Sequence, residues 1–295
     1  MHQDKNVDLE IEFLLSCLFD SSPETSRQNL LIRLITIIPF GVNPVKYFDT
    51  FDHAETRFLL RERYGRLLSD LKLRRDWKTL LNEEEFHFEK AVYLVSRLGD
   101  QAHIHYKTFA SQLDDLASGI RDRMQSASSI VEKIEILRNY LFHELHFSGN
   151  TEDYYDPDNT YLTCVLETKK GIPVSLGVLM MLVAERCGIV LHGVNLLGHF
   201  ILRLDTENDP LYIDAFNEGN FLSEEECIQI LIKQGISFSP FHLARAAGLD
   251  IILRMIRNLL QYAAASGDRK MEKMLQAHLN ILENKSNTKR INEEH

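Results

Sequence analysis

The sequence lacks a long hydrophobic run. Its longest uncharged apolar stretch, GIPVSLGVLMMLVA, covers residues 171–184, whereas a transmembrane helix needs about 18 or more such residues. The first residues, MHQDKNVDLEIEF, are charged and do not include the apolar segment of a secretory signal peptide. We therefore expect a soluble protein with no membrane partner.

Cysteine is scarce and scattered. The chain has four cysteines: Cys17, Cys164, Cys187 and Cys227. They form no CxxC pair, so neither a disulfide framework nor a cysteine-based zinc site is predicted. The segment FHELHF, residues 142–147, has two histidines three residues apart, whereas the zinc-protease motif HExxH requires a spacing of four. The sequence predicts reduced thiols in a cytoplasmic protein, with no metal and no cofactor.

Basic residues are in the minority, because 33 Lys and Arg face 43 Asp and Glu, which gives a net charge of −10. This balance makes nucleic-acid binding an unfavoured prediction, since phosphate recognition relies on surplus Lys and Arg. Residues 57–78 are an exception, with eight basic and three acidic side chains. We favour a solvated helix face there. The alternatives are a docking surface for an acidic partner and, as the weakest hypothesis, a nucleic-acid-linked regulatory role.

Helical periodicity dominates both ends of the chain. Residues 30–38 form an apolar segment that ends at Pro39, and a second helical segment follows over residues 55–81. Near the other end, residues 251–265 and 271–283 predict a helical hairpin. The intervening Ser-Gly-Asp suits a helix end followed by a new helix start.

The middle of the chain changes character. Residues 147–162, FSGNTEDYYDPDNTYL, are rich in Gly, Asn, Asp and Pro and show no period, which predicts a long ordered or functional loop. On either side, Ser129 with Glu132 and Ser223 with Glu226 have the capping-box spacing of helix starts.

Residues 197–217, LGHFILRLDTENDPLYIDAFN, read as two short strands around a polar turn. If the turn places Leu204 opposite Leu211, alternation puts His199 and Asp214 on one face as diagonal neighbours. Such a carboxylate orients the imidazole and favours its protonated form. Two interpretations are equally open: half of a catalytic set, or a His–Asp hydrogen bond that only joins two strands.

A nucleophile for this pair is expected at a helix N-terminus, where free N–H groups stabilise an anion. The helix in that neighbourhood starts with Lys-Gly-Ile-Pro-Val-Ser-Leu, residues 170–176, and has no cysteine there. Ser175 is a candidate. We favour a first-turn hydrogen-bonding role for it, because such hydroxyls commonly bond the helix backbone and a serine needs a strongly positioned base.

The order of these motifs resembles the transglutaminase-like superfamily, which is related to papain-type cysteine enzymes. The shared features are a Gly-Ile-x helix start, a Gly-Ile after that helix, a histidine strand and an aspartate strand. In that superfamily a Gly-x-Cys triplet opens the helix, and the match places Pro173 where the cysteine stands. His199 in GHF and Asp214 in YIDAF match the histidine and the aspartate. The resemblance therefore implies loss of the cysteine chemistry.

Longer segments are similar to one branch, the SirB-type invasion-regulator family. They are DPDNTYLTCVLETKKGIPVSLGVLMMLVAERCGI, GVNLLGHFILRL, LYIDAFNEG and LSEEEC, and the resemblance spans roughly residues 86–284. It implies an α+β fold that is mostly helical, with a papain-like core of a central helix on a small antiparallel sheet. The expected segments are a helical N-terminal region (1–82), the transglutaminase-like domain (83–235), a tetratricopeptide-like helical hairpin (236–284) and a disordered tail (285–295).

Two function hypotheses follow. The first is a non-catalytic protein- or peptide-binding regulatory module that uses the former active-site cleft. The alternative is a hydrolase or acyl-transferase that uses Ser175, or a water activated by His199 and Asp214. Asn159 and Asp156 are further binding candidates, with Asn159 as an oxyanion donor, although such residues commonly form local turns. The sequence sets no oligomeric state.

Overall fold

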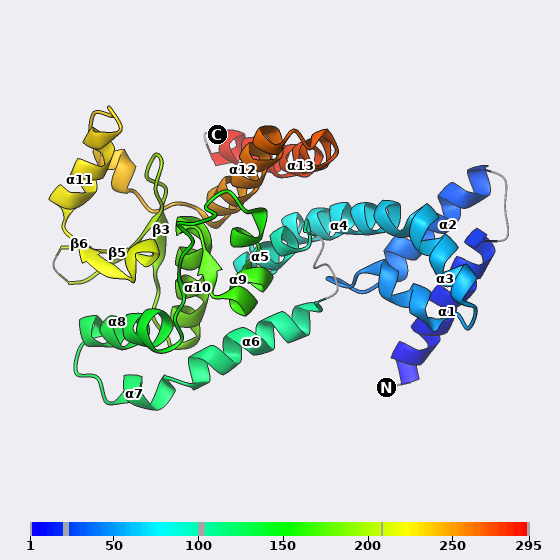
Figure 1. Ribbon diagram of the computed structural model, residues 1–295, viewed down its shortest axis with the longest axis horizontal. Helices are drawn as coiled ribbons and strands as arrows, with labels where there is room; N and C mark the ends of the chain where they lie inside the picture. Colours follow the sequence, from blue (N-terminus) through cyan, green and yellow to red (C-terminus); the bar gives the residue numbers. More distant parts are fainter. Residues whose placement is uncertain (1, 20–23, 100–103, 208, 294–295) are drawn as a thin grey trace. The chain divides into compact units, whose positions relative to one another are not determined.

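The computed structural model describes residues 2–19, 24–99, 104–207 and 209–293 (Figure 1). The chain forms two compact units. Unit 1 consists of Met1–Phe86 with Ala102–Tyr106, and unit 2 of His87–Gln101 with Lys107–His295. The candidate site residues proposed from the sequence all belong to unit 2.

Unit 1 is helical. Its elements are α1 (His2–Phe19), α2 (Glu24–Ile37), the 3-10 helix η1 (Pro44–Thr50), α3 (Ala54–Leu60), the π-helical segment η2 (Arg61–Gly65) and α4 (Arg66–Leu81). The predicted helices are confirmed, since α2 ends before Pro39 and the run from α3 to α4 covers residues 55–81. Apolar side chains of these helices pack into one core that includes Leu15, Leu34, Phe48, Leu60 and Leu68.

The basic segment of unit 1 is not simply a solvated face. Lys72 and Asp76, one helical turn apart on α4, are only 1% and 2% exposed and form an ion pair. The second oxygen of Asp76 accepts the Gly41 N–H at 3.2 Å. Our interpretation of residues 57–78 as a solvated face was therefore wrong for Lys72. The pattern of charges along the helix could not reveal this, because the burial comes from distant segments.

Unit 2 contains the sheet. Four antiparallel strands follow the order β3 (His192–Val194), β4 (Ile201–Leu204), β5 (Leu211–Asp214) and β6 (Asn220–Leu222). The central helix α10 (Pro173–Arg186) packs against β3 and β4. Gly177 makes this contact possible, because a Cβ there would lie 2.6 Å from the Phe200 ring. The predicted α+β class is confirmed.

Other elements of unit 2 surround this core (Figure 1). They are α5 (Phe88–Ser96), α6 (Tyr106–Ser118), α7 (Arg121–Gln125), α8 (Ile130–Arg138), η3 (Asn139–Glu144), β1 (Ser148–Gly149), η4 (Pro157–Asn159), α9 (Leu162–Thr168), β2 (Lys170–Gly171), η5 (Ala215–Asn217), α11 (Glu224–Lys233), η6 (Pro240–Leu243), α12 (Gly248–Ser266) and α13 (Arg269–Glu293). Helix α12 contacts α5, α10 and α13. It therefore joins the C-terminal hairpin to the central helix.

The predicted caps are largely confirmed. Ser223 and Glu226 form a complete capping box at the start of α11, with bonds of 3.2 and 2.8 Å. Ser129 accepts the Glu132 N–H at 3.1 Å. The Glu132 carboxylate also bonds the N–H and the hydroxyl of Ser128.

The C-terminal hairpin turns where the sequence predicts. Gly267 ends α12 with a φ of 72°, and Asp268 Oδ1 accepts the N–H groups of Lys270 and Met271. Helix α13 continues to Glu293, so most of the segment for which we predicted a disordered tail is helical. The physical reason is that residues 269–293 contain neither Pro nor Gly. Residues 294–295 lie outside the described residues.

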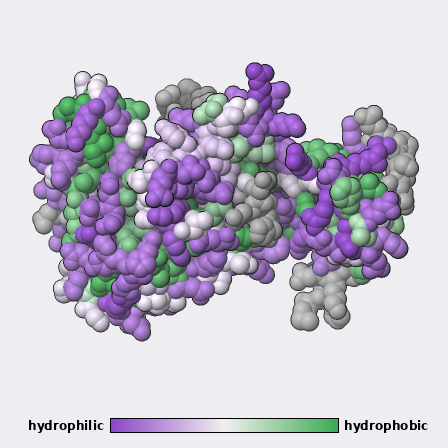
Figure 2. Space-filling model, in the orientation of Figure 1, coloured by the Kyte–Doolittle hydropathy of each residue, from purple (hydrophilic) through white to green (hydrophobic). Residues whose placement is uncertain are grey.

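One face of the molecule is mainly hydrophilic, with hydrophobic side chains gathered over α11 (Figure 2). Ile232 on that helix and Phe241 on the nearby η6 are both exposed. Single exposed apolar residues are ordinary on protein surfaces. In the described part of the chain, no helix is both long enough and apolar enough to cross a membrane.

Candidate functional site

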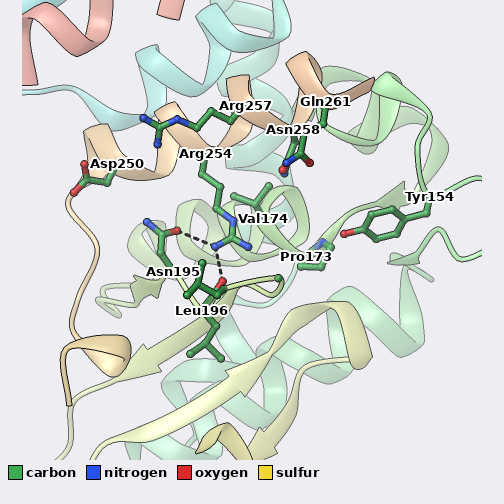
Figure 3. A pocket seen from close by; sticks show the side chains of 12 residues that line it. Tyr154, Pro173, Val174, Asn195, Leu196, Asp250, Arg254, Arg257, Asn258 and Gln261 are labelled. Carbon is green, nitrogen blue, oxygen red and sulfur yellow. Dashed lines mark hydrogen bonds between the residues drawn. The ribbon is translucent and has the colours of Figure 1, made fainter. Parts of the chain in front are cut away.

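A cleft of about 490 Å³ opens in unit 2 between the start of α10, the loop after β3, and α12 (Figure 3). Its lining consists of Tyr154, Pro173, Val174, Asn195, Leu196, Leu197, Gly198, Asp250, Arg254, Arg257, Asn258 and Gln261. Its volume lies within the range of about 300–1,000 Å³ that is usual for small-ligand sites. The cleft therefore has the size of a binding site.

Pro173 is the first residue of α10 and lines this cleft (Figure 3). Proline suits this position because its fixed φ matches the helix and its missing N–H needs no partner there. A proline side chain has no group that can attack a substrate. At the position where the family resemblance places the cysteine, the cleft thus presents an apolar ring.

Ser175 lies one turn inside α10 and has no exposed surface. Its Oγ donates to the Asn159 carbonyl oxygen at 2.5 Å and accepts the Ile172 N–H at 3.0 Å. Gly171 leaves room for this hydroxyl, since a Cβ there would lie 2.8 Å from it. The Ser175 hydroxyl therefore links the long loop to the start of the helix, and main-chain groups take up its hydrogen bonds.

Asn159 and Asp156 are used within the loop. The Asn159 side-chain amide donates to the Asp153 carbonyl oxygen at 2.6 Å and accepts from Asn150 at 3.0 Å. Asp156 Oδ1 accepts the Asp158 N–H at 2.9 Å, which caps η4. These bonds build an ordered loop, as residues 147–162 predicted. Asp156 also lines a smaller pocket of about 60 Å³ beside the main cleft.

The hairpin of β4 and β5 has the predicted register, with Leu204 paired to Leu211. His199 itself lies just before β4, which begins at Ile201, rather than on the strand. Gly198 precedes it with a φ of 73°, a conformation that glycine adopts without strain. The predicted neighbours do meet, because Nε2 of His199 lies 2.8 Å from Oδ2 of Asp214.

Asp214 is 3% exposed and is surrounded by donors. Its Oδ1 accepts the N–H groups of Phe216 and Asn217, and its Oδ2 accepts the Asn217 side-chain amide at 2.7 Å. Burial alone would raise the pKa of Asp214, but the His199 and Asn217 hydrogen bonds and the His199 charge lower it overall. The carboxylate is therefore ionised at neutral pH.

This ionised carboxylate selects one tautomer of the neutral His199 ring. A carboxylate only accepts hydrogen bonds, so Nε2 of His199 carries the proton it donates to Asp214. In the neutral ring Nδ1 is then the basic nitrogen. Among the described residues nothing hydrogen-bonds to Nδ1. The pair thus keeps one unused proton acceptor.

Aromatic rings connect this pair with the cleft. The His199 and Phe216 ring centres are 6.4 Å apart, and those of Phe216 and Tyr154 are 6.0 Å apart, both in edge-to-face geometry. Tyr154 lines the cleft beside Pro173 (Figure 3). Gly149 packs under Phe216, because a Cβ there would lie 2.5 Å from the ring.

The structure thus brings the predicted site residues together in two groups. His199 and Asp214 bond each other, whereas Ser175 and Asn159 bond each other and the backbone. Within the described part of the chain, every hydrogen bond of the Ser175 hydroxyl goes to a main-chain group.

Sequence reasoning missed Arg254, whose side chain enters the cleft from α12. Its Nη1 donates to the Leu196 carbonyl oxygen at 2.8 Å, across 58 residues of sequence. Nothing in the local pattern of α12 indicates this contact, because the acceptor is a main-chain oxygen of a distant loop.

The two buried cysteines of unit 2 are poor nucleophiles. Burial raises the pKa of the Cys164 and Cys227 thiols to about 12. Among the residues that the structure describes, no cluster of three or more His, Cys, Asp and Glu side chains is arranged to hold a metal ion.

Comparison with known proteins gives the family. Residues 107–257 match the model of the transglutaminase-like superfamily. A UPF0162 protein of Xylella fastidiosa strain 9a5c is 42% identical over 191 residues, which cover 62% of this chain and 68% of that protein. Human F-box only protein 21 is 28% identical over 261 residues, which cover 79% of this chain and 40% of that protein.

The matched lengths differ among relatives. The UPF0162 protein of Xylella fastidiosa strain Temecula1 is 42% identical over 146 residues, and the chain spans only 52% of its length. No solved structure gives a significant match. The family model covers half of the chain and includes Pro173, His199 and Asp214. The chain belongs to the transglutaminase-like superfamily.

Proposed function

We propose that this protein is a non-catalytic transglutaminase-like module that binds a protein or peptide segment in the cleft and acts as a regulator in the cytoplasm. The supporting observation is Pro173, an apolar ring that lines the cleft where the family resemblance puts a cysteine. The proposal depends on this site and not on the fold, since the same fold hosts unrelated activities.

The rim of the cleft supports this proposal. Leu197 lines the cleft and is 53% exposed, and Tyr154 beside it is also exposed. Tyr155, which lines the adjoining smaller pocket, is exposed as well. Aromatic side chains are enriched at protein interfaces. An extended segment lying in the cleft would cover these side chains.

Two finer proposals accompany it. We place the chain in the SirB-type branch, on the motifs that run from residue 156 to residue 227. We also propose that the α12–α13 hairpin is a tetratricopeptide-like unit, supported by its Gly267 turn. A lone unit of that type cannot bury its own apolar face, and α12 packs against α10 and α5.

The net charge of −10 makes nucleic acid an unfavoured partner.

A peptide-binding measurement tests the main proposal. A random hexapeptide library would be bound to the wild type and to the Leu197→Arg variant, which places a large charged side chain at the cleft. We expect a subset of peptides to bind the wild type and to lose at least tenfold in affinity for Leu197→Arg, because the rim contact is lost.

Val190→Arg is the matched control, since Val190 is similarly exposed at 65% but does not line the cleft. It should bind the same peptides as the wild type. If no peptide binds the wild type, or if Leu197→Arg binds as well as Val190→Arg, the cleft is not the binding site.

One observation favours the alternative, a hydrolase or acyl-transferase: Nδ1 of His199 has no hydrogen-bond partner among the described residues while Asp214 holds Nε2. In that function Nδ1 would take a proton from a water. Turnover of activated esters and amides by the wild type, abolished in His199→Ala, would support this function. Ser175→Ala separates its two versions. Equal turnover by this variant would leave only the activated water, whereas lost turnover with an intact fold would make Ser175 the nucleophile.

A further inference from the structure

One cation in the cleft is not neutralised. Arg254 forms no ion pair with any described carboxylate. Its hydrogen bonds go to the Leu196 carbonyl oxygen at 2.8 Å and to the Asn195 side-chain oxygen at 3.5 Å, both from Nη1 (Figure 3). Nε and Nη2 make no hydrogen bond within the described residues, and neither is sealed from solvent. Two adjacent donors of one guanidinium are therefore open.

The nearest acidic side chain on α12, Asp250, does not neutralise Arg254. Asp250 lies one turn before Arg254 on α12, yet no ion pair joins them, and its carboxylate points away from the guanidinium (Figure 3). Arg257, three residues after Arg254 on the same helix, forms an ion pair with Glu283 at 2.8 Å. Of the two arginines that line the cleft, only Arg254 lacks a carboxylate partner among the described residues.

The guanidinium is also held in place and partly desolvated. It lies over the Phe200 ring, 5.7 Å from the ring centre, and the Leu196 carbonyl fixes its Nη1. Burial lowers the pKa of the Arg254 guanidinium, and the nearby Tyr154 offsets this only in part. A half-buried cation of this kind is costly unless an anion pairs with it.

The rest of the cleft suits a peptide around a carboxylate. Pro173 and Val174 are the first turn of α10, where the helix dipole favours negative charge. Asn258 and Gln261 supply amides that can donate to and accept from a peptide backbone, and Leu197 supplies an apolar contact. The protein as a whole carries a charge of −10, so attraction of an acidic ligand has to come from this local site.

We infer that the cleft recognises a peptide through a carboxylate, which pairs with the open Nε and Nη2 of Arg254 in a bidentate contact. An arginine presents these two donors in a planar fork that matches the two oxygens of a carboxylate. The carboxylate belongs to an Asp or Glu side chain or to the C-terminus of the peptide. This inference rests on the proposed peptide-binding function and adds the chemistry of its ligand.

The test uses the full chain and one hexapeptide library made in two forms, with free and with amidated C-termini. Half of each form contains Asp or Glu and half contains none. Binding is measured for the wild type, for Arg254→Gln, for Arg254→Lys and for Arg269→Gln. Arg269→Gln is the matched control, because it removes the same charge from an exposed position of the same helical hairpin that does not line the cleft.

We expect binding only by peptides that carry a carboxylate, and a loss of roughly ten- to a hundredfold in Arg254→Gln, the range for a hydrogen bond to a charged group. Arg269→Gln should stay within about threefold. Arg254→Lys keeps the charge and a donor for Leu196 and should fold, but it lacks the fork and should still lose about tenfold or more. It therefore decides the matter if Arg254→Gln unfolds.

The two forms of the library and the variants distinguish the possible outcomes. Binding restricted to free C-termini identifies a terminal carboxylate, and binding of amidated acidic peptides identifies a side chain. Binding that needs no carboxylate, or that survives in both Arg254 variants, overturns the inference and leaves the peptide-binding function standing. If no peptide of any form binds the wild type, both the inference and the proposed function fail.

Discussion

In each unit of this protein a basic side chain bonds a buried carboxylate, and the two pairs differ in which polar atoms are left without a hydrogen bond among the described residues. In unit 1, Lys72 and Asp76 are both almost fully buried, and the second carboxylate oxygen of Asp76 bonds Gly41. In unit 2, Asp214 is equally buried, but the His199 ring is partly exposed and its Nδ1 has no described hydrogen-bond partner.

The difference shows how a structural pair and a candidate site can be told apart. A cation and a carboxylate in contact occur in both units, so contact alone does not indicate function. In unit 1 the pair is closed off by the surrounding helices. In unit 2 the pair is closed only on the Asp214 side, and a chain of aromatic rings leads from His199 to a cleft. A polar atom that has no hydrogen bond among the described residues and can be reached by a ligand therefore indicates a candidate site. Nδ1 of His199 is such an atom, and so are Nε and Nη2 of Arg254.

The largest expected effect is in unit 1. Asp76→Ala removes the carboxylate that pairs with the buried Lys72 ammonium, which should lower the free energy of unfolding by about 3–5 kcal/mol. Trp77 is the single tryptophan of the chain and is buried in unit 1, so its fluorescence during urea denaturation reports on this unit.

Asp70→Ala is the control for this prediction. It breaks the Asp70–Arg74 pair on the same helix, where both side chains are partly exposed. Such pairs contribute at most about 1 kcal/mol. Equal urea midpoints for Asp76→Ala and Asp70→Ala would show that the buried pair is not essential to the stability of unit 1.

A smaller effect is expected in unit 2, and it should be unequal between the two partners. Asp214→Ala removes the acceptor for His199, for the Asn217 amide and for two main-chain N–H groups. We expect a loss of about 2–4 kcal/mol. His199→Ala removes one bond at a partly exposed ring and should cost about 1 kcal/mol.

Thermal unfolding followed by circular dichroism measures both variants. His199→Ala should still bind the peptides of the wild type when fully folded, since the ring does not line the cleft. Equal losses of stability in the two variants would mean that Asp214 serves only the histidine. Unchanged stability with lost binding in His199→Ala would instead make the histidine part of the binding site.

The smallest effect is a pH dependence. The folded protein lowers the pKa of Asp214, so this carboxylate contributes stability above the ordinary carboxyl pKa of about 3.9. The contribution is lost as the pH falls through the lowered folded value. The stability difference between the wild type and Asp214→Asn should therefore shrink on acidification below about pH 5. A difference that stays constant in urea titrations from pH 6 to pH 3 would contradict this.

Local patterns predicted those features whose causes are local. The turn over residues 205–210 and the alternation around it set the register that pairs Leu204 with Leu211, because a slip of one residue would reverse the two faces. Capping at Ser223 and the turn at Gly267 follow from residues three or four positions apart. For the same reason the His199–Asp214 contact followed from the hairpin alone.

Contacts between distant segments were not predictable in this way. Ser175 bonds a carbonyl 16 residues earlier, Asp76 an N–H 35 residues earlier and Arg254 a carbonyl 58 residues earlier. The residue types at these positions suit many environments, since a lysine or an arginine on a helix is usually solvated. Only the packing of other elements around them buries Lys72 and places Arg254 in a cleft.

The sequence by itself determined most of the helices, the hairpin and its register, and the helix start at Pro173, because each depends on backbone preferences over a few residues. The tertiary structure decided that the Ser175 hydroxyl bonds main-chain groups, that Lys72 is buried and that Arg254 lies in a cleft without a carboxylate partner among the described residues. The physical reason is that desolvation and the supply of hydrogen-bond partners depend on which distant segments pack around a side chain.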